Sequence, residues 1–206
     1  MICRDFIAIG ASWGGVDALR ALVAALPKHL PATIAIVQHV GAHTSVLPSL
    51  LGMAGPLAAA HARDGEKYER GRIYVAPPDF HLLVDGEHLR LSHGAKENLA
   101  RPAIDPLLRS VASTLGARAI GVVLTGMLED GAAGLAQIRA HSGTAIVQDP
   151  DDAFASEMPR HAAPYAHYVL PLAKLPALLI ALTGRGPPRG HSRSEFAAPL
   201  QHGNSQ

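Results

Sequence analysis

A serine stands at a glycine-rich bend near the start of the 206-residue chain. The segment Gly10-Ala11-Ser12-Trp13-Gly14 follows an apolar run and fits the Gly-x-Ser-x-Gly pattern, in which a strained turn from strand to helix exposes the serine hydroxyl. Free N–H groups at the start of the next helix would suit an oxyanion as well as a phosphate. The spacing of dinucleotide-binding and P-loop motifs is absent. Ser12 is therefore a candidate nucleophile, with a purely structural turn as the alternative.

A histidine and an aspartate follow two further apolar runs. His39 lies at the end of the run Thr33–Val40, and Asp130 comes shortly after the run Ala119–Thr125. If these runs are parallel strands, their carboxyl ends meet at one edge of the sheet. A serine hydroxyl needs an imidazole to take its proton, and the imidazole needs a carboxylate to fix its tautomer. Ser12, His39 and Asp130 therefore form a candidate catalytic triad.

Each member of this triad has an alternative interpretation. Glu129 and Asp149 are rival carboxylates, and Asp130 could serve only as the N-cap of a helix over residues 131–140. His39 and His43 have the His-x₃-His spacing of metal ligands, but the intervening glycine and the preceding strand pattern favour a loop. No cysteine cluster and no His-Glu-x-x-His segment supports zinc. We expect neither a metal nor another cofactor.

The elements that must position these residues are indicated by the apolar pattern. Apolar runs that do not alternate with polar residues are typical of strands buried on both faces of a parallel sheet; they cover residues 6–10, 33–40, 73–77, 119–125, 144–148 and 168–170. Segments with helical spacing lie between them, at residues 16–26, 45–53, 105–115, 131–140 and 158–166. This alternation predicts an α/β fold with a doubly wound, mostly parallel sheet and helices on both faces. Two short runs around Asp85-Gly86 predict an inserted antiparallel hairpin.

Composition limits the class of protein. With 48% hydrophobic residues, residues 1–183 can bury one core, whereas residues 184–206 have little to bury and are expected to form a flexible tail. A formal net charge of +1 gives no reason to expect a nucleic-acid partner. The single cysteine, Cys3, cannot form an internal disulfide. No apolar stretch has the length of a signal peptide or a membrane span, so we expect a cytoplasmic protein without membrane insertion.

Several motifs in register resemble the catalytic domain of the chemotaxis protein-glutamate methylesterase, known as CheB. The matching segments are Ile9-Gly10-Ala11-Ser12-x-Gly14-Gly15, Val37-Gln38-His39, Asp64-Gly65-Glu66, Gly71-Arg72-Ile73-Tyr74-Val75-Ala76-Pro77, Arg101-Pro102-Ala103-Ile104-Asp105, Leu124-Thr125-Gly126-Met127-x-x-Asp130-Gly131-Ala132 and Met158-Pro159-Arg160. They occur in the family's order across nearly the whole of the predicted folded region.

The resemblance implies a role for each triad residue. Ser12 would be the nucleophile, His39 the general base and acid, and Asp130 the residue that orients His39. The implied reaction is hydrolysis of γ-glutamyl methyl esters on the cytoplasmic helices of methylated chemoreceptors, often with deamidation of receptor glutamines, and it requires no cofactor. Backbone N–H groups near Trp13 and Met127 are candidates for the oxyanion hole.

The chain departs from the family pattern in several places. The family usually carries a receiver domain before this region, so phosphorylation control would need a separate receiver-domain or signalling protein, unless the chain is a fragment of a longer protein. Trp13 replaces a small residue and could narrow the substrate channel. An esterase or amidase of the same mechanism with another substrate is therefore one alternative, and a non-catalytic domain that binds receptors or signalling proteins is the other. Leu128 and Glu157 each stand where the family usually has glycine. Arg101 follows an alanine in place of the family's histidine, and we expect Arg101 to serve a structural role together with Asp105, near the start of a helix.

Overall fold

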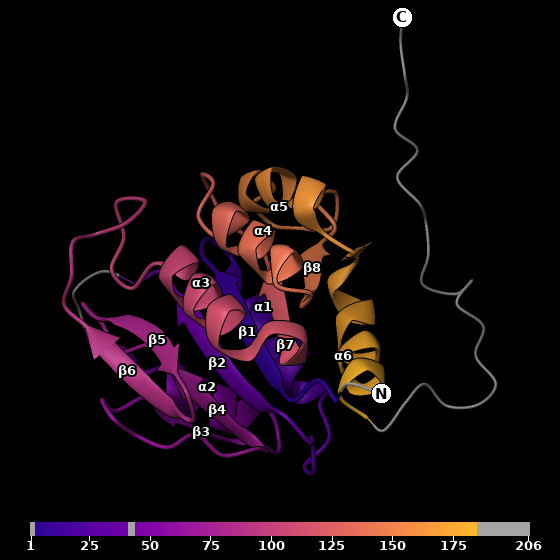
Figure 1. Ribbon diagram of the computed structural model, residues 1–206. Coiled ribbons are helices and arrows are strands. Elements are labelled where there is room, and N and C mark those ends of the chain that lie inside the picture. The colour runs from indigo at the N-terminus through magenta and orange to yellow at the C-terminus, as the bar shows by residue number, and fades with distance from the viewer. Residues whose placement is uncertain (1–2, 41–43, 185–206) are drawn as a thin grey trace, which may run out of the picture.

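A seven-stranded parallel sheet forms the centre of the molecule in a computed structural model, which describes residues 3–40 and 44–184 (Figure 1). The strand order is β3-β4-β2-β1-β7-β8-β9, and a separate antiparallel hairpin is formed by β5 and β6. The sheet strands are β1 (Phe6–Ala11), β2 (Thr33–Gln38), β3 (Ala58–His61), β4 (Arg72–Val75), β7 (Ala119–Val123), β8 (Thr144–Gln148) and β9 (Tyr168–Leu170). The hairpin strands are β5 (His81–Asp85) and β6 (His88–Ser92).

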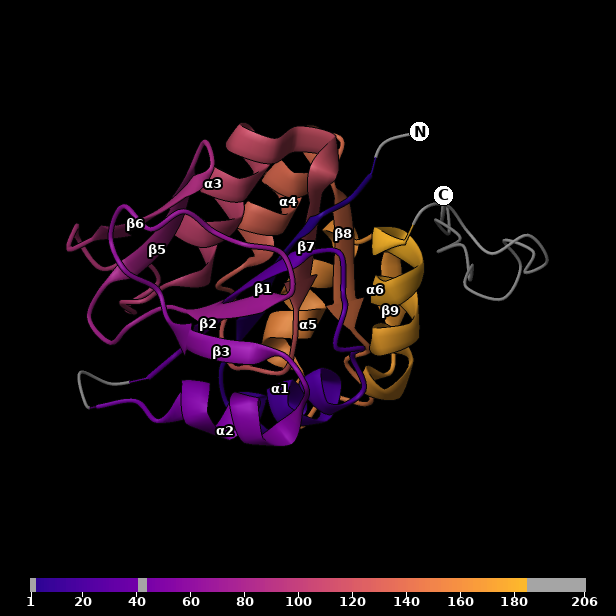
Figure 2. The ribbon, with the colours of Figure 1, turned by 90° about the horizontal axis from the view of Figure 1, so that it is seen from below.

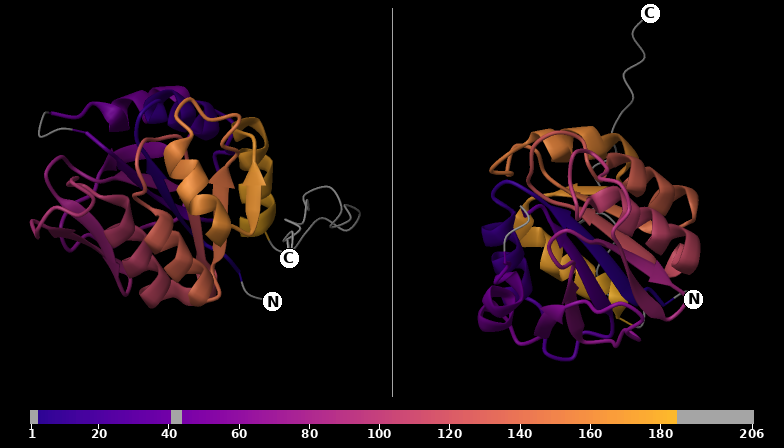
Figure 3. Two further views of the ribbon diagram at one scale, coloured as in Figure 1. Left: turned by 90° about the horizontal axis from the view of Figure 1, so that it is seen from above. Right: turned by 90° about the vertical axis from the view of Figure 1, so that its left-hand side faces the viewer.

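Helices cover both faces of the sheet. They are α1 (Gly15–Ala24), α2 (Leu47–Ala54), α3 (Ile104–Leu115), α4 (Ala132–Ala140), α5 (Glu157–Ala162) and α6 (Leu175–Thr183), with short 3₁₀ helices at Gly116–Arg118, Ala163–Tyr165 and Leu172–Lys174. One apolar core packs α1, α2 and α6 against the sheet, and the other packs α3, α4, α5 and the hairpin (Figure 2). Figure 3 (left) shows the same division, with indigo and purple helices on one side and magenta to orange helices on the other. The predicted fold class is confirmed.

The register of the central strands brings three strand ends to one edge. In β1, Ala11 pairs with Gln38 of β2, and Gly10 pairs with Val123 of β7. All six residues of β1 and of β2 are buried, which agrees with their unbroken apolar sequences. Because these two strands lie side by side and β7 flanks β1 on the other side, the segments that follow them converge. From β1, the chain adds β2 on one side of the sheet and later β7 on the other, so the strand order reverses at β1. A ligand site is expected where the strand order reverses in this way.

Gly10 shows how closely helix α3 approaches β1. A Cβ atom at this position would lie 2.3 Å from the Cγ2 atom of Ile104, in the first turn of α3. A side chain there would push α3 away from the sheet, so the motif glycine is needed for packing. This close contact also brings the N-terminal end of α3 to the edge where β1 ends.

Some elements differ from the sequence-based expectations. Strand β3 was not predicted, because its sequence of three alanines and a histidine has low strand propensity and lies at the partly exposed edge of the sheet. The predicted helix over 158–166 is shorter: α5 ends at Ala162, and a 3₁₀ turn containing Pro164 follows. Of the tail expected at residues 184–206, all but Gly184 lies outside the described part of the chain. Within the described residues, no helix has the length and apolar character that crossing a membrane requires.

Candidate active site

Ser12 is the first residue after β1 and is fixed by backbone hydrogen bonds. Its N–H donates to the Thr125 carbonyl at 3.0 Å, and its own carbonyl accepts from the Gly15 N–H at 2.8 Å. The turn needs a glycine at position 14, where φ is 76° and a Cβ atom would collide with Phe154. Ser12 itself is not among the residues with positive φ. The left-handed residue of the turn is Gly14.

The structure brings the three candidate triad residues together. The Nδ1 atom of His39 lies 3.1 Å from the Ser12 hydroxyl oxygen, and its Nε2 atom lies 2.7 Å from Oδ2 of Asp130. Asp130 is almost fully buried, whereas the His39 side chain is 20% exposed and Ser12 is half-buried. Since a carboxylate oxygen only accepts, Nε2 carries the proton and Nδ1 is left free to accept from the serine hydroxyl. The ring is therefore in the tautomer that a general base requires.

Asp130 is surrounded by donors. Its Oδ2 atom accepts from the Ile104 N–H at 2.7 Å, and its Oδ1 atom accepts from the Asp105 N–H at 3.0 Å. Burial alone would raise the pKa of Asp130, but the hydrogen bonds from His39 and these two amides outweigh it and hold the pKa below its ordinary value. The carboxylate is therefore ionised at neutral pH and can stabilise an imidazolium at His39.

The alternative role suggested for Asp130, as N-cap of the helix that follows it, is wrong. Asp130 caps α3 through the amides of Ile104 and Asp105, and it makes no capping bond to α4. Helix α4 is served by Asp105, whose Oδ1 atom accepts from the N–H groups of Gly131 and Gly134 at 3.1 and 2.6 Å. Asp130 therefore caps α3, the helix that contains Asp105, and Asp105 caps α4, the helix that follows Asp130. These bonds connect Asp130 to two helices that pack against each other.

Asn98 bridges the two aspartates and was missed by the sequence analysis. Its Nδ2 atom donates to Oδ1 of Asp130 at 2.7 Å and to Oδ2 of Asp105 at 2.9 Å. Burial raises the pKa of Asp105, and the nearby charge of Asp130 adds to this effect. The amide of Asn98, an exposed residue, therefore separates two buried carboxylates. The expected structural role of Asp105 agrees with its capping bonds, but Arg101 hydrogen-bonds Asp79, at 2.7 and 2.9 Å, and is not paired with Asp105.

Replacing Asn98 with alanine should lower kcat about 10-fold with little change in KM. Without the amide, two carboxylates face each other and Asp130 can shift relative to His39, and a small misplacement in an active site is costly. Loss of two charge-assisted hydrogen bonds should also reduce the free energy of unfolding by about 1–3 kcal/mol. Ester hydrolysis and urea unfolding measure the two effects. The matched control is Gln137→Ala, which removes an exposed amide; equal effects of the two variants would contradict this role for Asn98.

The rival residues do not approach His39. Glu129 is exposed, and Asp149 accepts a hydrogen bond from the Asp151 backbone in its own loop. The second histidine of the His-x₃-His spacing, His43, lies outside the described residues. Over residues 3–40 and 44–184, no group of three or more His, Cys, Asp or Glu side chains is arranged to hold a metal ion.

Gln38 is a further residue that the sequence analysis did not assign to the site. Its buried side chain donates from Nε2 to the Ser12 carbonyl at 2.7 Å and to the His39 carbonyl at 3.2 Å. Its Oε1 atom would lie 2.1 Å from a Cβ atom at position 15, so Gly15 leaves the space that this amide occupies. A buried glutamine at the end of an apolar strand was the available signal, because burial of an amide requires polar partners.

Two backbone N–H groups beside Ser12 are available to a ligand. Within the described segments, neither the Trp13 nor the Met127 N–H donates to a protein acceptor. Gly126, the residue before Met127, packs against the serine, because a Cβ atom there would lie 2.8 Å from Cβ of Ser12. Unpaired donors next to a candidate nucleophile have the character of an oxyanion hole.

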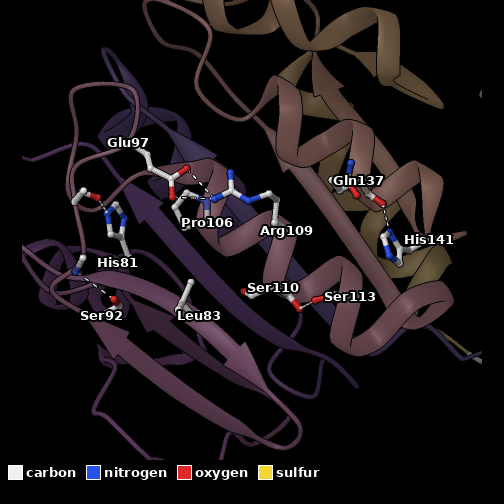
Figure 4. A pocket seen from close by; sticks show the side chains of 12 residues that line it. His81, Leu83, Ser92, Glu97, Pro106, Arg109, Ser110, Ser113, Gln137 and His141 are labelled. Atoms are coloured by element: carbon white, nitrogen blue, oxygen red, sulfur yellow. Dashed lines mark hydrogen bonds and ion pairs between the residues drawn. The ribbon is translucent and has the colours of Figure 1, made fainter.

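A concavity of about 680 Å³ lies elsewhere, between the hairpin and helices α3 and α4 (Figure 4). It is not lined by Ser12, His39 or Asp130. Several of its charged and polar groups hydrogen-bond within the protein: Arg109 donates to Glu97, and His81 bonds to the Ala95 carbonyl. These contacts favour a structural role for the polar groups in this concavity, and we assign no ligand to it.

The fold and the site together define a class: α/β proteins with a parallel sheet that bring Ser, His and Asp side chains together at the carboxyl edge of the sheet. Comparison with known families then shows which family within this class the chain belongs to. Residues 7–179 match the family model described as CheB methylesterase, and the chain belongs to this family.

Relatives and a solved structure support this membership. The chain is 38% identical to a relative in Leptospira interrogans over 86% of this chain and 94% of that protein. It is 36% identical to the protein-glutamate methylesterase/protein-glutamine glutaminase of Thermotoga maritima, over 88% of this chain but 55% of that protein. The crystal structure of the Thermotoga maritima CheB methylesterase catalytic domain matches with a TM-score of 0.84 and 35% identity, covering 88% of this chain and all of that one.

Proposed function

We propose that this chain hydrolyses γ-glutamyl methyl esters of chemoreceptors, with Ser12 as nucleophile, His39 as general base and acid, and Asp130 as the orienting carboxylate. The observation that carries the proposal is the pair of hydrogen bonds made by His39, at 3.1 Å to Ser12 and 2.7 Å to Asp130. The names of the relatives supply the substrate class, because protein-glutamate methylesterase/protein-glutamine glutaminase denotes attack on a glutamyl ester or amide.

The proposed reaction proceeds through an acyl-enzyme. His39 takes the Ser12 proton on Nδ1 while Oγ attacks the ester carbonyl, and the resulting oxyanion accepts from the N–H groups of Trp13 and Met127. The tetrahedral intermediate then collapses, and the bond between the carbonyl carbon and the methoxy oxygen breaks. The methoxide takes the proton from Nδ1 of His39 and leaves as methanol. A water molecule then gives its proton to His39 and attacks the acyl carbon, which frees the glutamate and returns the proton to Ser12. The same sequence on a glutamine side chain would release ammonia.

The surroundings of Ser12 suit a macromolecular substrate. Four large apolar side chains near this edge are well exposed: Trp13 63%, Phe154 75%, Leu128 55% and Met127 42%. Phe154 packs on Gly14, beside Trp13, and Gly126 of the Met127 loop contacts Ser12. Exposed apolar residues gathered around a site are typical of a protein-binding surface. We therefore propose the methylated cytoplasmic helices of chemoreceptors as the partner, which places the chain in the cytoplasm. Control by a separate receiver-domain or signalling protein is part of the same proposal.

An esterase or amidase of the same mechanism with a different substrate is the second candidate. Trp13 favours it, because this large exposed ring stands directly beside the nucleophile and can restrict which acyl group reaches Ser12.

Methanol release from a panel of esters tests the substrate assignment. The panel contains a methylated receptor fragment, the same fragment with its glutamyl esters moved to non-methylation positions, and p-nitrophenyl acetate. We expect kcat/KM for the methylated receptor to exceed that for the shifted fragment at least about 10-fold, since a remote binding surface raises the rate only for the correctly placed ester. A preference for the aryl ester with no receptor turnover would favour the second candidate.

A further inference from the structure

We propose that Glu157 and His161 are positioning residues that hold the Met127 N–H toward the oxyanion, by fixing the backbone of Leu128. This inference rests on the proposed esterase chemistry and extends it to residues outside the triad. The residues concerned are the loop Gly126–Leu128 and the segment 155–161, which includes most of α5.

Hydrogen bonds hold this loop on both sides of Met127. The Gly126 N–H donates to the Ala155 carbonyl, and the Gly126 carbonyl accepts from the Met158 N–H, each at 3.0 Å. On the other side, the Leu128 N–H donates to Oε2 of Glu157 at 2.9 Å. The Leu128 carbonyl accepts from Nδ1 of His161, also at 2.9 Å.

These contacts leave Met127 as the one residue of the loop whose N–H has no acceptor among the described residues. The Met127 N–H shares its peptide plane with the Gly126 carbonyl, which accepts from Met158, and the next peptide, between Met127 and Leu128, donates to Glu157. The peptide planes on both sides of Met127 are therefore held by the 155–161 segment. Gly126 also packs against Ser12 and against the Met158 sulfur, and a Cβ atom there would lie 2.2 Å from that sulfur. A fixed donor beside the nucleophile is what stabilisation of an oxyanion requires.

Leu128 needs the support that Glu157 and His161 provide. Its φ of 66° lies in the left-handed region, which is unfavourable for a residue with a branched side chain. The side chain is 55% exposed, so burial contributes little to holding this conformation. The carboxylate of Glu157 and the imidazole of His161 contact the two backbone groups of this residue. We infer that these two bonds keep Leu128 left-handed and hold the Met127–Leu128 peptide in place, which limits rotation of the Met127 backbone and so keeps its N–H in position.

A double-mutant cycle separates this role from a general effect on folding. Glu157→Ala should lower kcat for p-nitrophenyl acetate about 5- to 10-fold and leave KM within about twofold, because the donor is displaced and not removed. In a Leu128→Gly background the same change should cost less than about twofold, since glycine adopts positive φ without strain. Glu87→Ala, which removes a carboxylate on the distant hairpin, is the control and should leave kcat unchanged.

Amide hydrogen exchange gives a second readout that needs no activity. Glu157→Ala should speed exchange at Leu128, whose N–H loses its acceptor, while exchange at residues of β1 stays unchanged. The proposal is overturned if Glu157→Ala leaves both kcat and Leu128 exchange as in the parent, or if the cost in kcat is equal in the leucine and glycine backgrounds. If Ser12→Ala retains ester hydrolysis, the proposed function fails, and the exchange experiment still decides whether Glu157 fixes Leu128.

Discussion

Replacing Ser12 with alanine should lower kcat for ester hydrolysis by at least about 10⁴-fold. The hydroxyl is the group that forms the acyl bond in the proposed reaction, and no neighbouring side chain can replace it. The remaining rate would come from binding and from the N–H groups of Trp13 and Met127. Methanol release, followed with enzyme in excess over substrate, measures the chemical step directly.

The fold should survive this substitution. The Ser12 hydroxyl makes one hydrogen bond, to His39, and the turn itself is held by backbone bonds that alanine keeps. We expect the free energy of unfolding to change by less than about 1 kcal/mol. Ser113→Ala on α3 is the control, because it removes a hydroxyl bonded only to the Ser110 carbonyl. Labelling of the parent by a fluorophosphonate, and its absence in Ser12→Ala alone, would identify the nucleophile; full activity of Ser12→Ala would refute the assignment.

The sequence was informative wherever an element is defined by local pattern. Strands β1, β2, β7 and β8 are continuous apolar runs, and their burial on both faces follows from this. The hairpin was predicted from two short runs and a turn. From these elements alone, the ends of β1 and β2 and the loop after β7 could be placed at one edge. The short alanine strand β3 has no such pattern and is formed by pairing with β4.

The surroundings of the site depend on contacts between distant segments, and these could not be predicted. Asn98 reaches Asp130 across 32 positions, and Glu157 reaches Leu128 across 29. Neither contact has a local signature, because each depends on how α3, α4 and α5 pack. The alternative considered for Asp130, a cap on the helix that follows it, was wrong for the same reason. The sequence shows which helix follows a residue, but not that the packing of α3 against β1 brings the N-terminus of α3 to Asp130.

Replacing Asp130 with asparagine should lower kcat by about 10³- to 10⁴-fold. Both carboxylate oxygens accept hydrogen bonds: Oδ2 from His39 and Ile104, and Oδ1 from Asn98 and Asp105. An amide has one oxygen, so its NH₂ group must face a pair of donors in either orientation. If the NH₂ faces His39, the ring moves its proton to Nδ1 and can no longer accept from the serine. If it faces away, the imidazolium loses its counter-charge.

Two neighbouring carboxylates serve as controls for this assignment. Asp149→Asn and Glu129→Gln remove the rival charges and should leave kcat within about threefold of the parent, since neither side chain approaches His39. If either control loses as much activity as Asp130→Asn, or if Asp130→Asn keeps more than a tenth of kcat, the carboxylate of the triad has to be reassigned.

Acid titration separates the structural role of Asp130 from its catalytic one. Asp130→Asn also loses one of the two hydrogen bonds that cap α3, so we expect a loss of about 1–3 kcal/mol in the free energy of unfolding at neutral pH. Because the pKa of Asp130 is lowered in the folded state, its contribution to stability is complete above the unfolded pKa of about 3.9 and is lost as the pH falls through the folded pKa. The stability difference between parent and variant should therefore shrink below about pH 4. A difference that stays constant down to pH 2 would mean that the ionised carboxylate does not stabilise the fold.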